Sequence, residues 1–246
     1  MISVTILAKN AEQYLEKVLH ALQKFDDVIV LENGSSDKTV EIAQGFKNVR
    51  LIRSTFIGFG PTHNHASSLA KHDWILSIDA DEIASKALVD EILSLSLDDT
   101  CLYTVSRHNF FRGKFIKGCG WYPDCPVRLY NKRKTQFSDA IVHEAIRSEG
   151  FTKVSLKAPL YHYPYNSISD FLAKMQSYST LFAKQYQGKR RASLVSAISH
   201  GIFAFIKSYF LKRGIFLGAE GFIISLYNAH TAYYKYLKLQ ELNKKL

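Results

Sequence analysis

The sequence predicts an α/β fold, a mostly parallel sheet flanked by helices, followed by a helical and basic carboxyl-terminal extension. In the first half of the chain, apolar runs of strand length alternate with helical patterns, which is typical of parallel sheets. From residue 167 onward, apolar residues recur at helical spacing. Residues 1–150 carry 18 Lys and Arg against 19 Asp and Glu, whereas residues 151–246 carry 14 against 3. We therefore expect a domain over 1–165 and an extension over 166–246.

The expected elements follow one another in strand–helix order. Apolar runs predict strands at 3–7, 28–31, 49–52 and 74–78, and the continuous run at 28–31 suits a strand covered on both faces. Apolar residues at steps of three and four, and turn residues placed to begin a helix, predict helices at 11–25, 40–46, 62–71 and 84–97. Shorter strands are expected at 102–106, 127–130 and 141–146. The aromatic and basic stretch 107–126 is expected to be a loop-rich insertion over a binding site.

The stretch WILSIDADEI, residues 74–83, runs an apolar strand directly into Asp79, Asp81 and Glu82. Carboxylates this close repel one another, so either water or a cation must offset their charge. If the backbone stays extended, Asp79 and Asp81 point to one side while Ala80 faces away. Such a pair suits Mg²⁺ or Mn²⁺ together with substrate phosphates. The alternative is an exposed acidic turn at the start of the next helix.

Two other predicted strands also end in polar residues. Lys9 and Asn10 follow the first strand, and Glu32 and Asp37 flank the turn after the second. The carboxyl ends of parallel strands lie at one edge of the sheet, where α/β folds bind nucleotides. Taken singly, Asp37 could be a helix cap and Asn10 a turn residue.

Three segments, TILAKNAEQYL, VIVLENGSSDKTVEIA and WILSIDADE, resemble family 2 glycosyltransferases of the GT-A fold in order and spacing. Two further segments, RLYNKRKTQFSDAIVHEAI and YFLKRGIFLGAEGF, extend the resemblance to bacterial lipopolysaccharide core β-1,4-glucosyltransferases. The resemblance covers nearly the whole chain. It implies a nucleotide-sugar donor and, through the carboxyl-terminal segments, the class of acceptor.

The resemblance also implies roles for single residues. Glu32 stands where the family usually has an Asp that binds uracil or ribose, and Asp37 matches the acidic residue of the same motif. Asp79 corresponds to the carboxylate nearer the ribose and Asp81 to the metal ligand, with Asp79 as a second candidate ligand. The remaining expected donor-binding residues are Lys9, Asn10, Asn64 and Ala80. Before Asn64, where relatives often carry a basic residue, stands His63.

Transfer with inversion needs a carboxylate that takes the proton of the acceptor hydroxyl. Glu144 and Asp139 are the candidates; the family's His-Glu pair favours Glu144, and His143 is a candidate phosphate contact, metal ligand or structural histidine. Asp124 and Arg128 are expected to line the acceptor or pyrophosphate pocket, unless they form an ordinary ion pair. Trp121 is expected either to stack on a sugar or to anchor a loop.

The basic extension has aromatic residues at helical spacing, which indicates packing and not a nucleic-acid groove. We expect an amphipathic surface that rests on an anionic membrane; the alternative is a plain solvated helix face. The residues expected to face outward are Lys207, Lys212, Arg213, Lys235 and Lys238. The amino terminus has no basic leader, and Lys207 and Glu220 interrupt the most apolar stretches. The expected location is the cytoplasm, peripheral on the inner face of the bacterial inner membrane.

The resemblance implies a metal-dependent inverting hexosyltransferase that moves glucose from UDP-glucose to a heptose of the lipopolysaccharide inner core. The expected acceptor is lipid-anchored, and no nucleic-acid partner is expected. One alternative is transfer of another UDP-sugar to a capsule or O-antigen. The other is a non-catalytic, membrane-associated binding protein. A nucleotidyltransferase is disfavoured because LAKNAEQYL lacks the glycine-rich loop of that class.

Overall fold

The computed structural model describes residues 1–138, 145–165 and 167–245. The chain divides into two compact units, the first made of Met1–His108 and Asp124–His162 and the second of Asn109–Pro123 and Tyr163–Leu246. The boundary expected after residue 165 lies close to the second change of unit. The segment 109–123, which the sequence places in the first part, belongs to the second unit.

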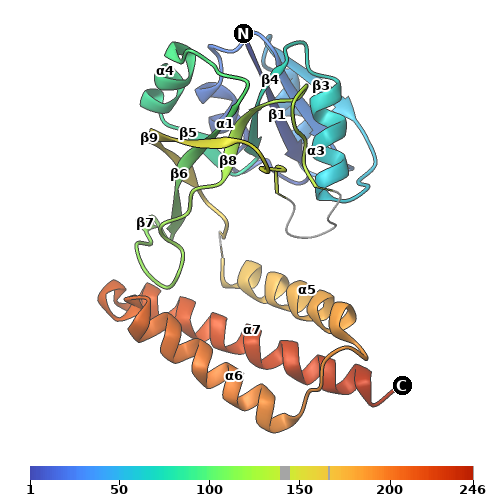
Figure 1. Cartoon of the computed structure of the whole chain (residues 1–246), viewed down its shortest axis with the longest axis vertical. Helices are drawn as coiled ribbons and strands as arrows, with labels where there is room; N and C mark the ends of the chain where they lie inside the picture. Colours follow the sequence, from blue (N-terminus) through green and yellow to red (C-terminus); the bar gives the residue numbers. More distant parts are fainter. Residues whose placement is uncertain (139–144, 166, 246) are drawn as a thin grey trace. The chain divides into compact units, whose positions relative to one another are not determined.

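The first unit is built on one mixed sheet with the strand order β3-β2-β1-β4-β8-β6-β9-β5 (Figure 1). The four strands β3, β2, β1 and β4 run parallel to one another. β8 runs antiparallel to β4, and β9 runs antiparallel to β5. The last residues of β6 and the short strand β7 pair with each other, and both belong to the second unit. The strands are β1 Ile2–Ala8, β2 Val28–Glu32, β3 Val49–Arg53, β4 Trp74–Asp79, β5 Glu82–Ala84, β6 Cys101–Phe111, β7 Lys114–Phe115, β8 Val127–Asn131 and β9 Thr152–His162. The predicted α/β sheet is confirmed, but β5, β7 and the long strand β9 were not predicted.

Helices cover both faces of this sheet. Successive residues of a strand point to opposite faces, so one strand contributes apolar side chains to two cores. Val28 and Val30 pack in one core cluster with α1 (Leu15–Ala21) and α4 (Lys86–Ser94). Ile29 packs in a second cluster on the other side. α2 (Thr39–Gln44) joins the first cluster, and α3 (Phe59–Ser68) contacts β1 and β2. β2 has only apolar side chains before Glu32, whereas β1 contains the buried Ser3 and Thr5 and β4 the buried Ser77.

The strand register aligns the polar strand ends. Ala8 at the end of β1 lies opposite Glu32 at the end of β2. Leu7 lies opposite Asp79, the last residue of β4. The three carboxyl ends therefore meet at one edge of the sheet, as the sequence predicts.

The second unit contains three long helices, in which α5 and α6 both pack against α7 (Figure 1). The helices are α5 Ile168–Tyr186, α6 Leu194–Ile206 and α7 Ala219–Asn243, with the short helices η1 Lys207–Leu211 and η2 Gly214–Leu217 between α6 and α7. Among the described residues one helical stretch, Leu194–Leu211, has the length and composition to cross a membrane. Capping boxes at Ser167 and Ser193 begin α5 and α6.

Glycines permit close backbone crossings in this unit. A Cβ on Gly118 would lie 2.8 Å from the Lys212 carbonyl oxygen, and one on Gly214 would lie 2.9 Å from that of Ser208. Gly221 packs directly on the Gly214 backbone. The stretch YFLKRGIFLGAEGF, which the resemblance links to the acceptor class, therefore also has a packing role.

Candidate active site

The chain turns sharply where β4 meets the acidic cluster. β4 ends at Asp79, Ala80 and Asp81 form a turn, and β5 begins at Glu82. The Asp79 N–H donates to Glu82 Oε2 at 3.0 Å, which closes the turn. The expectation that an extended backbone directs Asp79 and Asp81 to one side is therefore wrong. β5 pairs with β9, and this long-range pairing redirects the chain.

Two arginines offset the charge of two of the three carboxylates. Arg128 on β8 donates from Nη2 to Asp79 Oδ2 at 2.5 Å and also to Glu82 Oε1. Arg107 on β6 donates to Glu82 Oε1 at 2.9 Å and to Asp124 Oδ2 at 2.8 Å. Glu82 is fully buried and Arg128 is 6% exposed. Asp124 and Arg128 are therefore linked through Arg107 and Glu82, in place of the direct pair that the sequence left open.

The ion pairs of Arg128 determine the protonation states of Asp79 and of Arg128 itself. Burial alone would raise the pKa of the Asp79 carboxyl, but the positive charge of Arg128 lowers it well below its usual range. Burial opposes the charge of Arg128, and Asp79 and Glu82 raise the pKa of its guanidinium. Asp79 is therefore ionised and already paired, which reduces what it can offer to a metal ion.

His63 lies beneath this network as a neutral side chain. It is 3% exposed and stacks on Phe137 with ring centroids 4.4 Å apart. Burial lowers its pKa to about 4, with Asp79 acting in the opposite direction. His63 therefore carries no charge near neutral pH and does not replace the basic residue of related sequences.

Asp81 faces His162, a residue that the sequence analysis missed. His162 Nε2 lies 3.5 Å from Asp81 Oδ1, and His162 is the last residue of β9. The alternation of Val154, Leu156 and Leu160 is the signal that would have predicted β9.

The Asp81–His162 pair fits a divalent cation as a partial ligand set. No group of three or more His, Cys, Asp or Glu residues that could hold a metal occurs within 1–138, 145–165 and 167–245. One carboxylate and one imidazole would supply two ligands, and Mg²⁺ or Mn²⁺ commonly completes its coordination with substrate phosphates and water. The donor types therefore suit a metal that is bound together with a diphosphate.

The loop after β2 organises the second group of predicted residues. Asn10 Oδ1 accepts from Ser36 N–H at 2.9 Å, and Asn10 N–H donates to Ser35 Oγ at 3.0 Å. Ser35 N–H in turn donates to the buried carboxylate of Glu32. These contacts bring Asn10 and Glu32 together, whereas Lys9 is exposed to solvent.

Asp37 fixes the start of α2 within the same loop. Its carboxylate accepts from Thr39 N–H and from Glu12 N–H, each at 3.0 Å, and from Thr39 Oγ1 at 2.5 Å. Burial would raise the pKa of the Asp37 carboxyl, but these hydrogen bonds lower it. Asp37 thus holds the turn before α2, but Lys38 is the N-cap of this helix and no side chain caps it, so the capping role that the sequence left open for Asp37 is not present.

Asn64 holds the segment that leads toward the predicted base. Its side-chain amide donates to the Phe137 carbonyl at 3.0 Å and accepts from Phe137 N–H at 2.9 Å. Ser138 N–H donates to the Ala145 carbonyl at 2.8 Å. Asp139, His143 and Glu144 lie outside the described residues.

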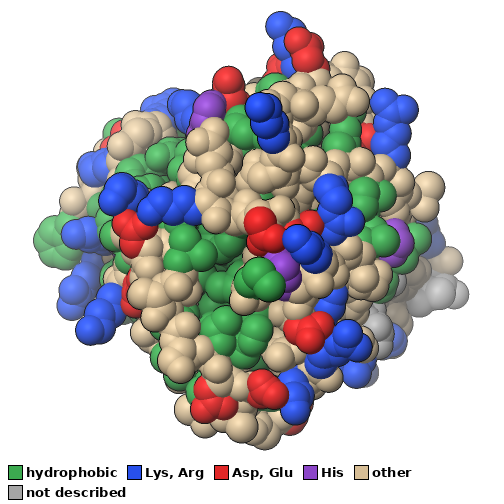
Figure 2. All heavy atoms as spheres, turned by 90° about the horizontal axis from the view of Figure 1, so that it is seen from above, with side chains coloured by type: hydrophobic (Ala, Val, Ile, Leu, Met, Phe, Trp, Pro, Cys, Tyr) green, Lys and Arg blue, Asp and Glu red, His purple; other side chains and the backbone are tan. Residues whose placement is uncertain are grey.

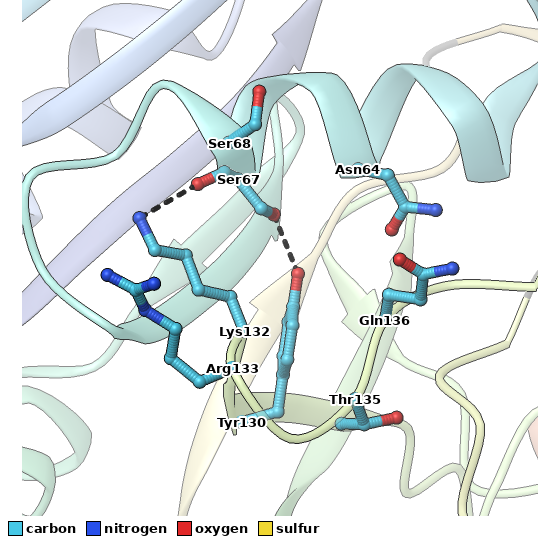
Figure 3. Close-up of a pocket in the computed structure, with 8 residues that line it drawn as sticks. All are labelled: Asn64, Ser67, Ser68, Tyr130, Lys132, Arg133, Thr135 and Gln136. Carbon is cyan, nitrogen blue, oxygen red and sulfur yellow. Dashed lines mark hydrogen bonds between the residues drawn. The ribbon is translucent and has the colours of Figure 1, made fainter.

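A polar cavity of about 330 Å³ lies beside α3, but its cations are already engaged (Figure 3). Lys132 points to the Ser67 and Ala70 carbonyls, with Nζ–O distances of 3.3 and 2.6 Å, and Ser67 Oγ bonds the Tyr130 hydroxyl. Arg133 pairs with Asp73 at 2.9 Å. Asn64 contributes to the lining, whereas the strand-end carboxylates do not. The cavity is therefore a weaker nucleotide site than the sheet edge.

In the second unit, Trp121 stacks on Tyr165 with ring centroids 5.5 Å apart, and its carbonyl accepts from Asn109. Trp121 thus anchors the 109–123 segment, the second of its two expected roles. Lys238 Nζ is bound by Gln176, Ser179 and Thr180 of α5. The expectation that Lys238 faces outward is wrong.

Lys235 also departs from the expected arrangement. Its Nζ lies over the Phe182 ring at 5.4 Å, and burial lowers its pKa. A partly buried ammonium on an aromatic face contributes to packing between α5 and α7. The outward-facing cations are thus Lys207, Lys212 and Arg213.

Charges of both signs are interspersed on the face drawn in Figure 2, where Asp and Glu side chains lie next to Lys and Arg side chains. This distribution agrees with the near balance of charges over residues 1–150.

Similarity to known proteins extends over nearly the whole chain. The chain is 31% identical over 261 residues to an uncharacterized glycosyltransferase of Rickettsia bellii, which covers 98% of this chain and 87% of that protein. It is 26% identical over 255 residues to LpsC of Rhizobium meliloti, a lipopolysaccharide core biosynthesis glycosyltransferase, with 98% and 92% covered. Among solved structures, Staphylococcus aureus TarS 1–349 in complex with UDP-GlcNAc has a TM-score of 0.48 at 14% identity, with 99% and 90% covered. Residues 3–153 match the family model of glycosyl transferase family 2, and the chain belongs to that family.

Proposed function

We propose that the protein is a metal-dependent inverting hexosyltransferase that moves glucose from UDP-glucose to a heptose of the lipopolysaccharide inner core. The observation that carries the proposal is the placement of Asp81 and His162, 3.5 Å apart, beside an Asp79 that Arg128 already neutralises. Membership of family 2 supports sugar transfer. The name of the Rhizobium relative supports the acceptor class.

The chain's own residues would divide the work along the sheet edge. The loop that contains Asn10, Glu32 and Asp37 is rigidly hydrogen-bonded and offers a preformed surface for the nucleoside of the donor. Arg107 and Arg128 hold Asp79 and Glu82 in place. A divalent ion bound by Asp81 and His162 would stabilise the negative charge of the departing diphosphate.

Inversion is a single displacement. The acceptor oxygen bonds to the anomeric carbon while the bond from that carbon to the diphosphate oxygen breaks, and a carboxylate takes the acceptor proton. We assign that role to Glu144, with Asp139 as the alternative. A Glu144→Gln variant that transfers sugar normally would move the assignment to Asp139.

Release of nucleoside diphosphate from a panel of nucleotide sugars, with and without Mn²⁺ or Mg²⁺, tests the proposal. Wild-type protein should hydrolyse UDP-glucose slowly, and only with metal. Asp81→Asn should lower that rate about 100-fold or more, because it weakens the electrostatic stabilisation of the leaving group. The matched control is Asp99→Asn, since Asp99 is a half-exposed surface residue that pairs with Lys134 at 3.3 Å.

The outcomes separate the alternatives. Turnover of a different UDP-sugar would indicate another cell-surface glycan. A protein that releases no nucleotide from any donor, and whose Asp81→Asn variant keeps full function in cells, would be a non-catalytic binding protein. Hydrolysis that is equal with and without metal would remove the role given to Asp81 and His162.

A further inference from the structure

The outer face of α6 in the second unit exposes large apolar side chains. Val195, Ile198, Ile202 and Ile206 recur at steps of three and four residues, which places them on one side of the helix. Phe203 is 60% exposed and Phe210, just beyond α6, is 53% exposed. We call these six residues the α6 face. Apolar patches that remain exposed on this scale mark interaction sites.

The opposite side of α6 is already committed to α7 through small residues. Ala197 and Gly201 are buried, and a Cβ on Gly201 would lie 3.3 Å from the Tyr233 Cβ and 3.4 Å from the Ala229 carbonyl oxygen. Ser208 is buried and hydrogen-bonded to Ser225 and Asn228 of α7. The helix therefore turns its small residues inward and its large apolar residues outward. A helix pair that is stabilised only by its own core shows the reverse distribution.

The charges around the α6 face identify the partner. No Asp or Glu residue occurs between Asp170 and Glu220, whereas eight Lys and Arg residues do. Lys207, Lys212 and Arg213 follow α6 directly and are exposed. A second copy of the chain would bring two strongly basic surfaces together, which is unfavourable. An anionic bilayer offers both an apolar interior and a negative surface.

We infer that the α6 face lies in the boundary between headgroups and acyl chains of an anionic bilayer, with α6 parallel to the membrane plane. Crossing the bilayer is disfavoured, because α6 is packed on α7, whose Lys235, Lys238 and Glu241 would be carried into the hydrocarbon. The inference deepens the proposed function, because a lipid-anchored acceptor requires an enzyme that works at the membrane surface. The contact is apolar as well as electrostatic, and the α6 face supplies the apolar side of the amphipathic surface that the sequence predicts.

Sedimentation with vesicles tests the inference on the full chain, using phosphatidylcholine alone or mixed with phosphatidylglycerol. Wild-type protein should bind the anionic vesicles, and part of this binding should survive high salt, because salt screens charges but not apolar contacts. Phe203→Ser/Phe210→Ser should weaken binding at least about tenfold, since burying one phenylalanine is worth roughly that factor or more. Both side chains are largely exposed, so the variant should keep the wild-type circular dichroism and melting temperature.

The matched control is Leu172→Ser/Leu181→Ser on α5, whose side chains are 54% and 40% exposed; it should bind as wild type does. A Phe203→Trp variant should show blue-shifted tryptophan emission with anionic vesicles and quenching by brominated lipid. Unchanged binding of the double Phe variant, or an emission of the Phe203→Trp variant that does not shift, would overturn the inference. A third outcome would also overturn the inference. If the wild-type protein binds no vesicles and is a dimer that the double Phe variant converts to a monomer, the α6 face belongs to a second copy of the chain.

Vesicle binding needs neither donor nor acceptor, so it can succeed or fail independently of the proposed function. Metal-dependent donor hydrolysis by the double Phe variant should equal that of wild type. Hydrolysis without vesicle binding would leave the transferase intact and remove only the membrane contact. Vesicle binding without hydrolysis would support the membrane contact and remove the proposed transferase activity.

Discussion

Two groups of carboxylates lie at the same edge of the sheet, and the chain satisfies them in different ways. Glu32 and Asp37, after β2, accept hydrogen bonds mainly from backbone N–H groups of their own loop and of Glu12. Asp79 and Glu82, at the end of β4, are held by guanidinium groups from β6 and β8. Backbone donors shape a loop, whereas arginines cancel charge.

The difference explains how an apolar strand can run into three acidic residues. Arg107 and Arg128 compensate Asp79 and Glu82 from within the protein. Only Asp81, which is 37% exposed in its side chain and close to His162, has no arginine partner among the described residues. The charge left over is the one suited to an external cation.

The largest expected effect on stability comes from removing the positive charge of Arg128. Arg128→Met leaves the fully buried Glu82 with fewer compensating charges, so the free energy of unfolding should fall by about 3–5 kcal/mol in denaturant titrations. Arg133→Met is the matched control, because the Arg133–Asp73 pair has side chains 72% and 50% exposed and should cost less than about 1 kcal/mol. Equal losses in the two variants would show that the β4 network does not depend on charge compensation.

The parallel half of this edge could be predicted from the sequence, because β1, β2 and β4 are mainly apolar runs with polar residues at or directly after their ends. The charge compensation could not. Arg107 and Arg128 reach Glu82 only because β6 and β8 join the sheet beside β4 in an antiparallel order, and long-range pairing leaves no local pattern.

The missed histidine has a different cause. Strand β9 does alternate, with Leu156 and Leu160 buried, so its existence was predictable from period-two spacing. Its pairing with β5, which brings His162 to Asp81, depends on the turn at Ala80 and is not encoded in either segment alone. Strand identity is thus a local property here, while the approach of His162 to Asp81 is a tertiary one.

The second prediction concerns the pH dependence of stability that arises from His63, which lies between Phe137 and the β4 network. Its pKa is lowered from 6.5 to about 4 in the folded protein, so between these values the unfolded chain binds a proton that the folded chain does not. Stability from this group is complete above about pH 6.5 and is lost as the pH falls, by about 2 kcal/mol at pH 5. Denaturant titrations above pH 6.5 and at pH 5 should show this loss of unfolding free energy in wild type and not in His63→Phe.

The control for this pH dependence is His65→Phe, since His65 is exposed on the same helix. It should keep the wild-type loss. The lowered pKa of Asp79 acts elsewhere on the pH scale, because stability from a depressed carboxyl is present above about pH 3.9 and disappears only below it. A pH dependence that remains in His63→Phe would mean that His63 is protonated in the folded state and that the charges above it are not balanced.

The smallest expected effect is at Asp37, where it separates the need for a hydrogen-bond acceptor from the need for a charge. Asp37→Asn keeps an oxygen for the Thr39 N–H group but loses the acceptor of the Glu12 N–H group, so it should lower the free energy of unfolding by about 0.5–1 kcal/mol, whereas Asp37→Ala removes both acceptors and should cost about 1–2 kcal/mol. The same isosteric change at Glu82 should be far more costly than at Asp37, since two guanidinium groups there face one carboxylate. If Asp37→Asn destabilises as much as Asp37→Ala, the loop after β2 also depends on negative charge, and the two carboxylate groups do not differ in kind.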